Sequence, residues 1–373
     1  MHLKRFERLY STIRQLSNGD HLDAVALNPG PTLTYLTGLG FHLMERPTVL
    51  LAAPGQVPVL VLPELEINKV RSAPVQLTAF TYNDNPASWS RSFKDAADML
   101  GLDGKRIGVE PNRMRVLELR FLEGALPNAE IISAEGVLSA LRMQKDAFEV
   151  ENMRQAVRIA QEALQATLPS IRAGVTERQI ASELFINLLR SGSDPELPFQ
   201  PIVSGGPNSA DPHASPSDRP LQQGDLLVID WGAAYKGYIS DLTRTFAIGE
   251  VEAEYRQIHE IVQKANASGR AASKPGIMAG SVDAAARKVI EEAGYGQQFT
   301  HRVGHGIGME GHESPYMYAE NTQILAPGMA FTVEPGIYLS GRNGVRIEDN
   351  MIVTETGAES LSDFPRELIT LGA

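Results

Sequence analysis

The 373-residue sequence predicts two domains, an N-terminal α/β domain and an α+β domain built on a curved antiparallel sheet. Chains of this length usually form more than one hydrophobic core. A content of 43% hydrophobic residues is enough to form large cores. Strands and helices alternate up to about residue 141, whereas beyond it strands come in pairs and helices come in pairs. We therefore expect domains of residues 1–142 and 143–373.

The first half reads as a regular alternation of elements. Amphipathic periodicity predicts a helix from Leu3 to Leu16, and the sequence Asn28–Pro31 predicts a turn or loop. The remaining predicted strands are 23–27, 48–53, 57–62, 106–110 and 130–132, and the remaining predicted helices are 88–100 and 114–123. No catalytic pattern stands out in this half.

The second half opens with helices. Apolar periodicity predicts helices over 146–168, from 176 onward, over 254–273 and over 282–292. Thr176 is the expected N-cap of the second of these, because Gln179 follows three residues later. Lys145, Glu149 and Glu151 are interpreted as a solvated helix face.

Composition narrows the classes of function. The absence of cysteine excludes disulfides, so a metal ion would be held by oxygen and imidazole ligands. The net charge of −11 argues against nucleic acid or an anionic membrane as the main partner. The sequence has no run of eighteen apolar residues and no apolar stretch of a signal peptide near Met1, so we expect a cytoplasmic protein.

Residues 331–350 predict two strands joined by a tight turn at Asn343-Gly344. The midpoint between Glu334 and Glu348 is Gly341, so an antiparallel return would place the two carboxylates opposite each other. Facing carboxylates repel unless one is protonated or a cation lies between them. The hairpin is therefore interpreted as half of a metal cage.

Residues 226–246 repeat this arrangement. An apolar strand ends in Asp230, a returning strand carries Asp241, and the midpoint of the two lies beside Gly237. Between the two hairpins lies His305, where Gly304 and Gly306 allow a close approach of the backbone.

The five candidate ligands Asp230, Asp241, His305, Glu334 and Glu348 are spaced by 11, 64, 29 and 14 residues. This set, with the local sequences 229–233, 240–245 and 303–308, resembles the pita-bread metallopeptidases: methionine aminopeptidase, prolidase and aminopeptidase P. The resemblance covers the whole chain and implies a C-terminal pita-bread domain behind an N-terminal α/β creatinase-like domain. Methionine aminopeptidase lacks such an N-terminal domain. Family resemblance also suggests a homodimer.

In that family these positions hold two divalent metal ions. The resemblance implies that Asp241 and Glu348 bridge both ions, that Asp230 binds one, and that His305 and Glu334 bind the other. Glu334 would also take the proton of the attacking water. Hard oxygen ligands favour manganese or cobalt, with zinc as an open alternative.

Three further residues match supporting positions of the family, and Thr243 is a fourth candidate because of its hydroxyl group. His213 and His312 match histidines that contact the substrate and stabilise the tetrahedral intermediate. Arg346 matches an arginine that braces the site, and the Thr243 hydroxyl can orient a ligating carboxylate.

The resemblance implies a peptide substrate with proline in the second position. Several prolidases carry an arginine four residues after the equivalent of His312, where this chain has Tyr316, and tyrosine cannot neutralise a carboxylate. We therefore expect an Xaa-Pro aminopeptidase, with an Xaa-Pro dipeptidase (prolidase) as the alternative. A hydrolase of another amide, or a non-catalytic binding protein of the same fold, is a remoter alternative.

Overall fold

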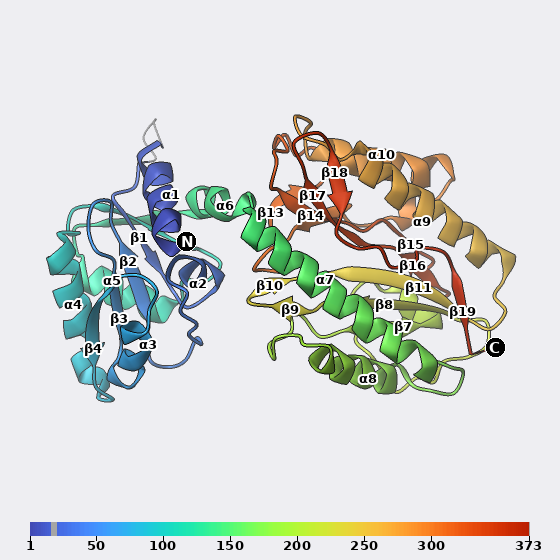
Figure 1. Ribbon diagram of the computed structural model, residues 1–373, viewed down its shortest axis with the longest axis horizontal. Helices are drawn as coiled ribbons and strands as arrows, with labels where there is room; N and C mark the ends of the chain where they lie inside the picture. Colours follow the sequence, from blue (N-terminus) through green and yellow to red (C-terminus); the bar gives the residue numbers. More distant parts are fainter. Residues whose placement is uncertain (16–20, 373) are drawn as a thin grey trace. The chain divides into compact units, whose positions relative to one another are not determined.

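The computed structural model describes residues 1–15 and 21–372, which divide after Arg142 into two compact units (Figure 1). The expected helix end at Leu16 lies outside the described residues. Within the described part of the chain, no helix is long and apolar enough to cross a membrane.

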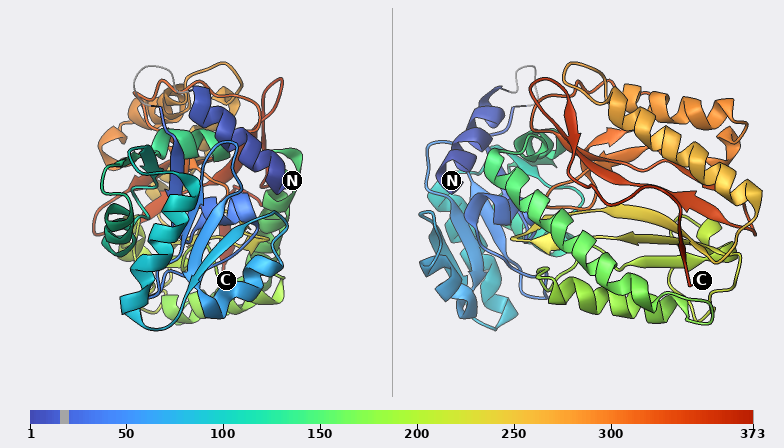
Figure 2. Two further views of the ribbon diagram at one scale, coloured as in Figure 1. Left: turned by 90° about the vertical axis from the view of Figure 1, so that its left-hand side faces the viewer. Right: turned by 45° about the vertical axis from the view of Figure 1, so that its right-hand side comes forward.

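The first unit is built on a six-stranded mixed sheet in the order β4-β3-β2-β1-β5-β6. Its blue strands face the viewer in the left view of Figure 2. Its strands are β1 (Ala24–Leu27), β2 (Val49–Ala52), β3 (Val59–Pro63), β4 (Thr78–Tyr82), β5 (Arg106–Val109) and β6 (Glu130–Ser133). Its helices are α1 (His2–Gln15), α2 (Pro31–Thr37), α3 (Ile67–Arg71), α4 (Trp89–Leu100), α5 (Val116–Ala125) and α6 (Glu135–Met143), the last of which runs to the boundary between the units. The central strands β1, β2 and β3 are buried throughout, which explains their uninterrupted apolar sequences.

Sequence periodicity located most of these elements and missed four. Helix α2 begins at Pro31, inside the stretch interpreted as a turn or loop, because proline fits the first helical position without losing a hydrogen bond. Strand β4 and the short helices α3 and α6 were not predicted.

The described part of the second unit contains two larger sheets whose strands pair antiparallel, except for one parallel pairing at an edge, and two antiparallel ribbons. One sheet has the order β19-β11-β8-β7 and the other β13-β12-β14-β17-β18, with two-stranded ribbons β9-β10 and β15-β16. The strands of the first sheet are β7 (Ile202–Gly205), β8 (Leu226–Trp231), β11 (Leu242–Ile248) and β19 (Ile369–Leu371). The second sheet has β12 (Gly304–Gly306), β13 (Glu313–Met317), β14 (Ala330–Val333), β17 (Asp349–Val353) and β18 (Ala358–Ser360). The ribbons are β9 (Ala234–Tyr235) with β10 (Tyr238–Ile239), and β15 (Gly336–Tyr338) with β16 (Gly344–Arg346).

Two pairs of helices cover these strands, and the strands lie between the pairs in Figure 1. The helices are α7 (Ala147–Thr167), α8 (Glu177–Arg190), α9 (Ala253–Ala272) and α10 (Gly280–Glu292). Helices α7 and α8 share a buried core with β8 and β11, in which Leu188 packs near Ile229. Helices α9 and α10 share another core with β14 and β17, which includes Val262 and Val333. The ligand-bearing strands are thus fixed from two sides.

The starts of α7 and α8 follow capping rules. Thr176 and Gln179 form the predicted capping box of α8. Asp146 and Glu149 form a second box on α7 that the sequence analysis did not identify.

The interpretation of Lys145 and Glu149 as a solvated face is wrong. Both side chains are buried, and of the three residues assigned to that face only Glu151 is exposed. Lys145 Nζ donates a hydrogen bond of 2.7 Å to Glu313 Oε1, while Glu149 Oε1 accepts one from the Tyr238 hydroxyl. Burial of these charges is tolerated because each has a partner.

Candidate metal centre

The second hairpin places its two glutamates face to face. The β14–β17 ladder pairs Val333 with Asp349, and the β15–β16 ribbon pairs Gly336 with Arg346. Both pairings have the same register, so the intervening Glu334 lies opposite Glu348, as the midpoint argument predicted.

The predicted position of the turn is wrong. The chain reverses over residues 339–343, where the Leu339 N–H donates to the Asn343 carbonyl and Gly341 has a φ of 73°. Gly344 already belongs to β16. The Asn343 side chain instead accepts a hydrogen bond of 2.9 Å from the Leu226 N–H, so it ties this hairpin to the start of β8.

The first hairpin reverses at Lys236 and Gly237, whose φ angles of 51° and 76° are those of a two-residue hairpin turn. Its register pairs Asp230 with Thr243, so Asp241 lies diagonal to Asp230 and not directly opposite it. An isolated bridge joins Thr243 to Glu348, and the Thr243 hydroxyl donates to Glu348 Oε2 over 2.7 Å. This contact brings the two hairpins together.

His305 lies in β12, between β13 and β14. A Cβ atom on Gly304 would lie 2.0 Å from the Thr332 carbonyl oxygen, and one on Gly306 would lie 2.4 Å from the Ser314 backbone. Only glycine fits at either position. The His305 Nδ1 lies 3.1 Å from the Gly306 carbonyl, a contact that assigns the proton to Nδ1 and leaves Nε2 as a lone-pair donor.

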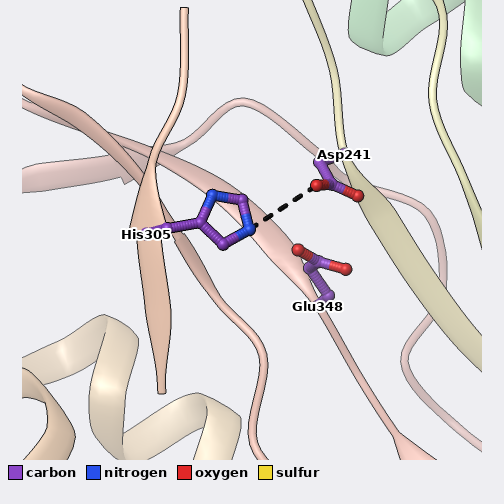
Figure 3. Close-up of side chains that lie close together, drawn as sticks. All are labelled: Asp241, His305 and Glu348. Atoms are coloured by element: carbon purple, nitrogen blue, oxygen red, sulfur yellow. Dashed lines mark ion pairs between the residues drawn. The ribbon is translucent and has the colours of Figure 1, made fainter. Parts of the chain in front are cut away.

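Nε2 of His305 faces the carboxylates. It lies 3.3 Å from Glu334 Oε1 and 3.7 Å from Asp241 Oδ2. Asp241, His305 and Glu348 offer ligand atoms that all lie within 4.8 Å of one another, and their side chains point toward one another in Figure 3. Asp230 completes the group, since it lies close enough to Asp241 for its negative charge to raise the pKa of that carboxyl group. The structure therefore brings together all five candidate ligands.

The electrostatics of this cluster favour a cation. Burial, followed by the neighbouring carboxylates, raises the pKa values of Asp241 and Glu348 well above their usual range. Burial also raises the pKa of Glu334 to about 7 and lowers that of His305 to about 3. The imidazole is thus neutral at pH 7, which is the form that binds metal ions.

Two buried oxygen atoms of this cluster have no hydrogen-bond partner among the described residues, Asp230 Oδ1 and Glu348 Oε1. An unpaired buried carboxylate oxygen is costly, and a divalent cation would satisfy it. The donor set of carboxylates and one imidazole, with no sulfur, suits a hard divalent ion. The residues present therefore fit a metal centre.

The predicted supporting residues surround the cluster. Arg346 donates to Asp230 Oδ2 over 2.7 Å and to the Thr243 hydroxyl over 3.1 Å, so it orients a candidate ligand. The exposed ring of His312 lies over that of His305, with 3.8 Å between ring centroids. His213 is exposed and follows Pro212, whose carbonyl accepts a hydrogen bond from Arg346.

Sequence reasoning missed a hydrogen-bonded chain behind Arg346. Arg346 Nη1 donates to the Tyr338 hydroxyl, which lies 2.9 Å from His301 Nε2. His301 Nδ1 in turn lies 2.7 Å from the Arg302 carbonyl. His301 lies four residues before His305, and Tyr338 lies four residues after Glu334. Neither spacing would identify these residues as part of the site from the sequence alone.

A second missed network fixes the backbone of the ligand strands. Arg244 donates to the carbonyl groups of Thr243 and Glu348 and forms an ion pair of 2.9 Å with the buried Asp349. Arg366 also pairs with Asp349. Burial alone would raise the pKa of Asp349, but the two guanidinium groups hold it at about 2.

The two hairpins and the glycine-flanked His305 bring four carboxylates and one imidazole together. This set of ligands is typical of a metal-dependent hydrolase. Residues 151–355 match the model of metallopeptidase family M24, and residues 8–144 match the creatinase/prolidase N-terminal domain. The chain belongs to metallopeptidase family M24. The expected pita-bread domain behind a creatinase-like N-terminal domain is confirmed.

Several relatives are similar over nearly the whole chain. A probable dipeptidase PepE from Mycobacterium bovis is 39% identical and covers 94% of this chain and 92% of its own length. The solved structure of an Xaa-Pro dipeptidase from Bacillus anthracis has a TM-score of 0.89 at 31% identity, with all of both chains covered. An X-Pro aminopeptidase from Thermotoga maritima has a TM-score of 0.85 at 30% identity and covers 98% of this chain and 99% of its own.

Proposed function

We propose that this metallopeptidase is an Xaa-Pro dipeptidase with a dinuclear metal centre. The observation that carries the proposal is the convergence of five candidate ligands, three of them buried, in which Asp230 and Glu348 each keep one oxygen without a hydrogen-bond partner in the described part of the chain. Five ligands of which four are carboxylates balance the charge of two dications. Manganese or cobalt suits this oxygen-rich set, and zinc remains an alternative.

The residues that would hold the ions are Asp230, Asp241, His305, Glu334 and Glu348. When bound, the ions supply the positive charge that acidifies a water molecule and polarises the scissile carbonyl. Arg346 and Thr243 hold Asp230 and Glu348 in orientation through hydrogen bonds of 2.7 Å each.

Glu334 is the residue that would accept the proton of the attacking water. Its Oε1 accepts a hydrogen bond of 3.2 Å from the Thr332 hydroxyl, which holds the carboxyl group in position for this transfer. The same carboxyl group can then hand the proton to the nitrogen of the departing proline.

His312 and His213 would contact the substrate on the open side of the cluster. Burial, the charge of Arg302 and the charge of His213 lower the pKa of His312, so its ring is neutral at pH 7. A neutral imidazole donates one N–H hydrogen bond, which stabilises the negative charge that develops on the scissile carbonyl oxygen.

The names of full-length relatives support a dipeptide substrate. The relative from Mycobacterium bovis is named a dipeptidase and the neighbour from Bacillus anthracis an Xaa-Pro dipeptidase. The second candidate function is the Xaa-Pro aminopeptidase that the sequence analysis favoured. It is supported by Tyr316, which cannot neutralise a carboxylate, and by the neighbour from Thermotoga maritima.

Three substrates compared at one metal concentration test the proposal: Xaa-Pro, Xaa-Pro-Yaa and Xaa-Ala-Yaa. We expect the highest kcat/KM for Xaa-Pro and poor cleavage of Xaa-Ala-Yaa. A higher kcat/KM for Xaa-Pro-Yaa would establish the aminopeptidase instead. Preferred cleavage of Xaa-Ala-Yaa would refute the proline assignment of both candidates.

Two further expectations belong to the proposal. We assign the catalytic domain to residues 143–373 and the N-terminal domain to residues 1–142, and we expect a homodimer. Light scattering of the purified protein measures the oligomeric state directly.

A further inference from the structure

Arg302 has an unusual environment. It lies three residues before His305, and its Cζ atom lies 4.4 Å from the centre of the Tyr316 ring. Both side chains are half-buried. Within residues 1–15 and 21–372, the guanidinium group has no carboxylate at ion-pair distance and makes no hydrogen bond. All five N–H donors of this partly buried guanidinium group are thus available. Such a group is suited to bind an anion.

Arg302 lies beside the candidate active site. It follows His301, whose Nε2 lies 2.9 Å from the Tyr338 hydroxyl that also binds Arg346, and it precedes β12, the strand of His305. Tyr316, which lies under its guanidinium group, belongs to β13, the strand paired with β12. The positive charge of Arg302 can therefore attract a negatively charged group of a molecule bound at the cluster.

The other arginine of the site is already engaged. Arg346 donates hydrogen bonds to Asp230, Thr243, Tyr338 and the Pro212 carbonyl, and it is 3% exposed. If Arg346 turned toward a substrate, its hydrogen bond with the candidate metal ligand Asp230 would be lost. This leaves Arg302 as the cation suited to a substrate anion.

We propose that Arg302, whose guanidinium group lies over the ring of Tyr316, binds the C-terminal carboxylate of the dipeptide substrate. In an Xaa-Pro dipeptide this carboxylate carbon lies roughly 2.5 Å from the scissile nitrogen, so it remains beside the metal cluster when the scissile bond is in place. A planar guanidinium forms paired hydrogen bonds with a carboxylate, and the tyrosine face fixes its plane. The inference rests on the proposed dipeptidase function.

This assignment also gives Tyr316 a role. The tyrosine cannot neutralise a carboxylate itself, but it supplies the surface on which Arg302 is stacked. A longer peptide offers a neutral carbonyl at the same place, which a guanidinium binds more weakly than a carboxylate. Arg302 would therefore act as a specificity-determining residue that favours dipeptides.

The test compares Xaa-Pro with its C-terminal amide, Xaa-Pro-NH2, in the metal-loaded protein. The unmodified protein should prefer the acid, and Arg302→Met should reduce the ratio of the two kcat/KM values by about 10- to 100-fold, mainly through a higher KM for the acid. The amide serves as an internal reference because it shares every contact except the charge. Arg178→Met is the matched control, since Arg178 is an exposed arginine paired with Asp218, and it should leave the ratio unchanged.

Substitutions at Arg302 and Tyr316 separate the contribution of the planar guanidinium group from that of its charge and from that of the tyrosine ring beneath it. Arg302→Lys keeps the charge without the planar fork and should give an intermediate ratio. Tyr316→Ala should lower the ratio more than Tyr316→Phe, which keeps the aromatic face.

The outcomes separate this inference from the proposed function. If the unmodified protein cleaves Xaa-Pro and Arg302→Met keeps its acid-to-amide ratio, the role of Arg302 is refuted while the dipeptidase stands. If the unmodified protein prefers the amide, the carboxylate site is refuted without any variant. If neither compound is cleaved, the dipeptidase function itself fails.

Discussion

Removal of the metal ions should make the stability of the protein depend on pH with an unusual sign. Glu334 is nearly buried, and without metal its pKa rises from an ordinary 4.5 to about 7. A carboxyl group whose pKa is raised by folding stabilises the fold fully below its unfolded pKa, and this contribution is lost as the pH rises through the folded pKa. A difference of 2.5 pKa units corresponds to roughly 3 kcal/mol, so the metal-free protein should lose that much stability between pH 4.5 and pH 7.

Thermal unfolding of the chelated protein measures this loss. For a catalytic unit of this size, roughly 3 kcal/mol corresponds to a fall in Tm of about 6–12 °C across that range. Asp241 and Glu348 act in the same direction, because their pKa values are also raised. The metal-loaded protein should show the opposite trend, since ions bind the deprotonated ligands. Glu334→Gln should reduce the fall in the chelated protein; an equal fall in that variant, or a flat Tm in the chelated parent, would refute the reasoning.

Four other substitutions give distinct outcomes. Asp241→Asn should lose bound metal by elemental analysis, whereas His312→Ala should keep its metal content and lose turnover by about a hundredfold; loss of metal in His312→Ala with an unchanged rate per ion would show that its role was misassigned. Lys145→Met should destabilise the protein by roughly 3–5 kcal/mol in urea unfolding because it removes the ammonium group that pairs with the buried Glu313 carboxylate, and adding Glu313→Gln should recover part of that loss. Gly306→Ala should cost roughly 3 kcal/mol or more and reduce metal binding, because its Cβ would overlap β13.

The sequence predicted the ligands well because the relevant signals are local. Alternating apolar residues located the hairpin strands, and the midpoint between Glu334 and Glu348 gave their pairing correctly. The same midpoint argument failed for Asp230 and Asp241, since the ladder is shifted and Asp230 faces Thr243. A midpoint locates a turn only to within a residue or two, and a shift of two keeps both side chains on the same face.

What the sequence did not reveal depends on long-range contacts. Asn343-Gly344 has the composition of a hairpin turn. The Asn343 side chain, however, accepts a hydrogen bond from the N–H of Leu226, which is 117 positions away in the chain. Lys145 has the periodicity of a surface residue, yet it pairs with Glu313, 168 positions away. Periodicity reports the environment of a residue within its own element and contains no information about a distant partner.

The bridge between Thr243 and Glu348 bears on the order of folding. Each hairpin closes between residues near in sequence, whereas this bridge joins positions 105 residues apart and forms only after both hairpins exist. One hairpin alone offers two carboxylates, too few to hold a divalent ion firmly. Ion capture should therefore follow the docking of the hairpins, and the ion should slow unfolding while leaving the rate of folding almost unchanged.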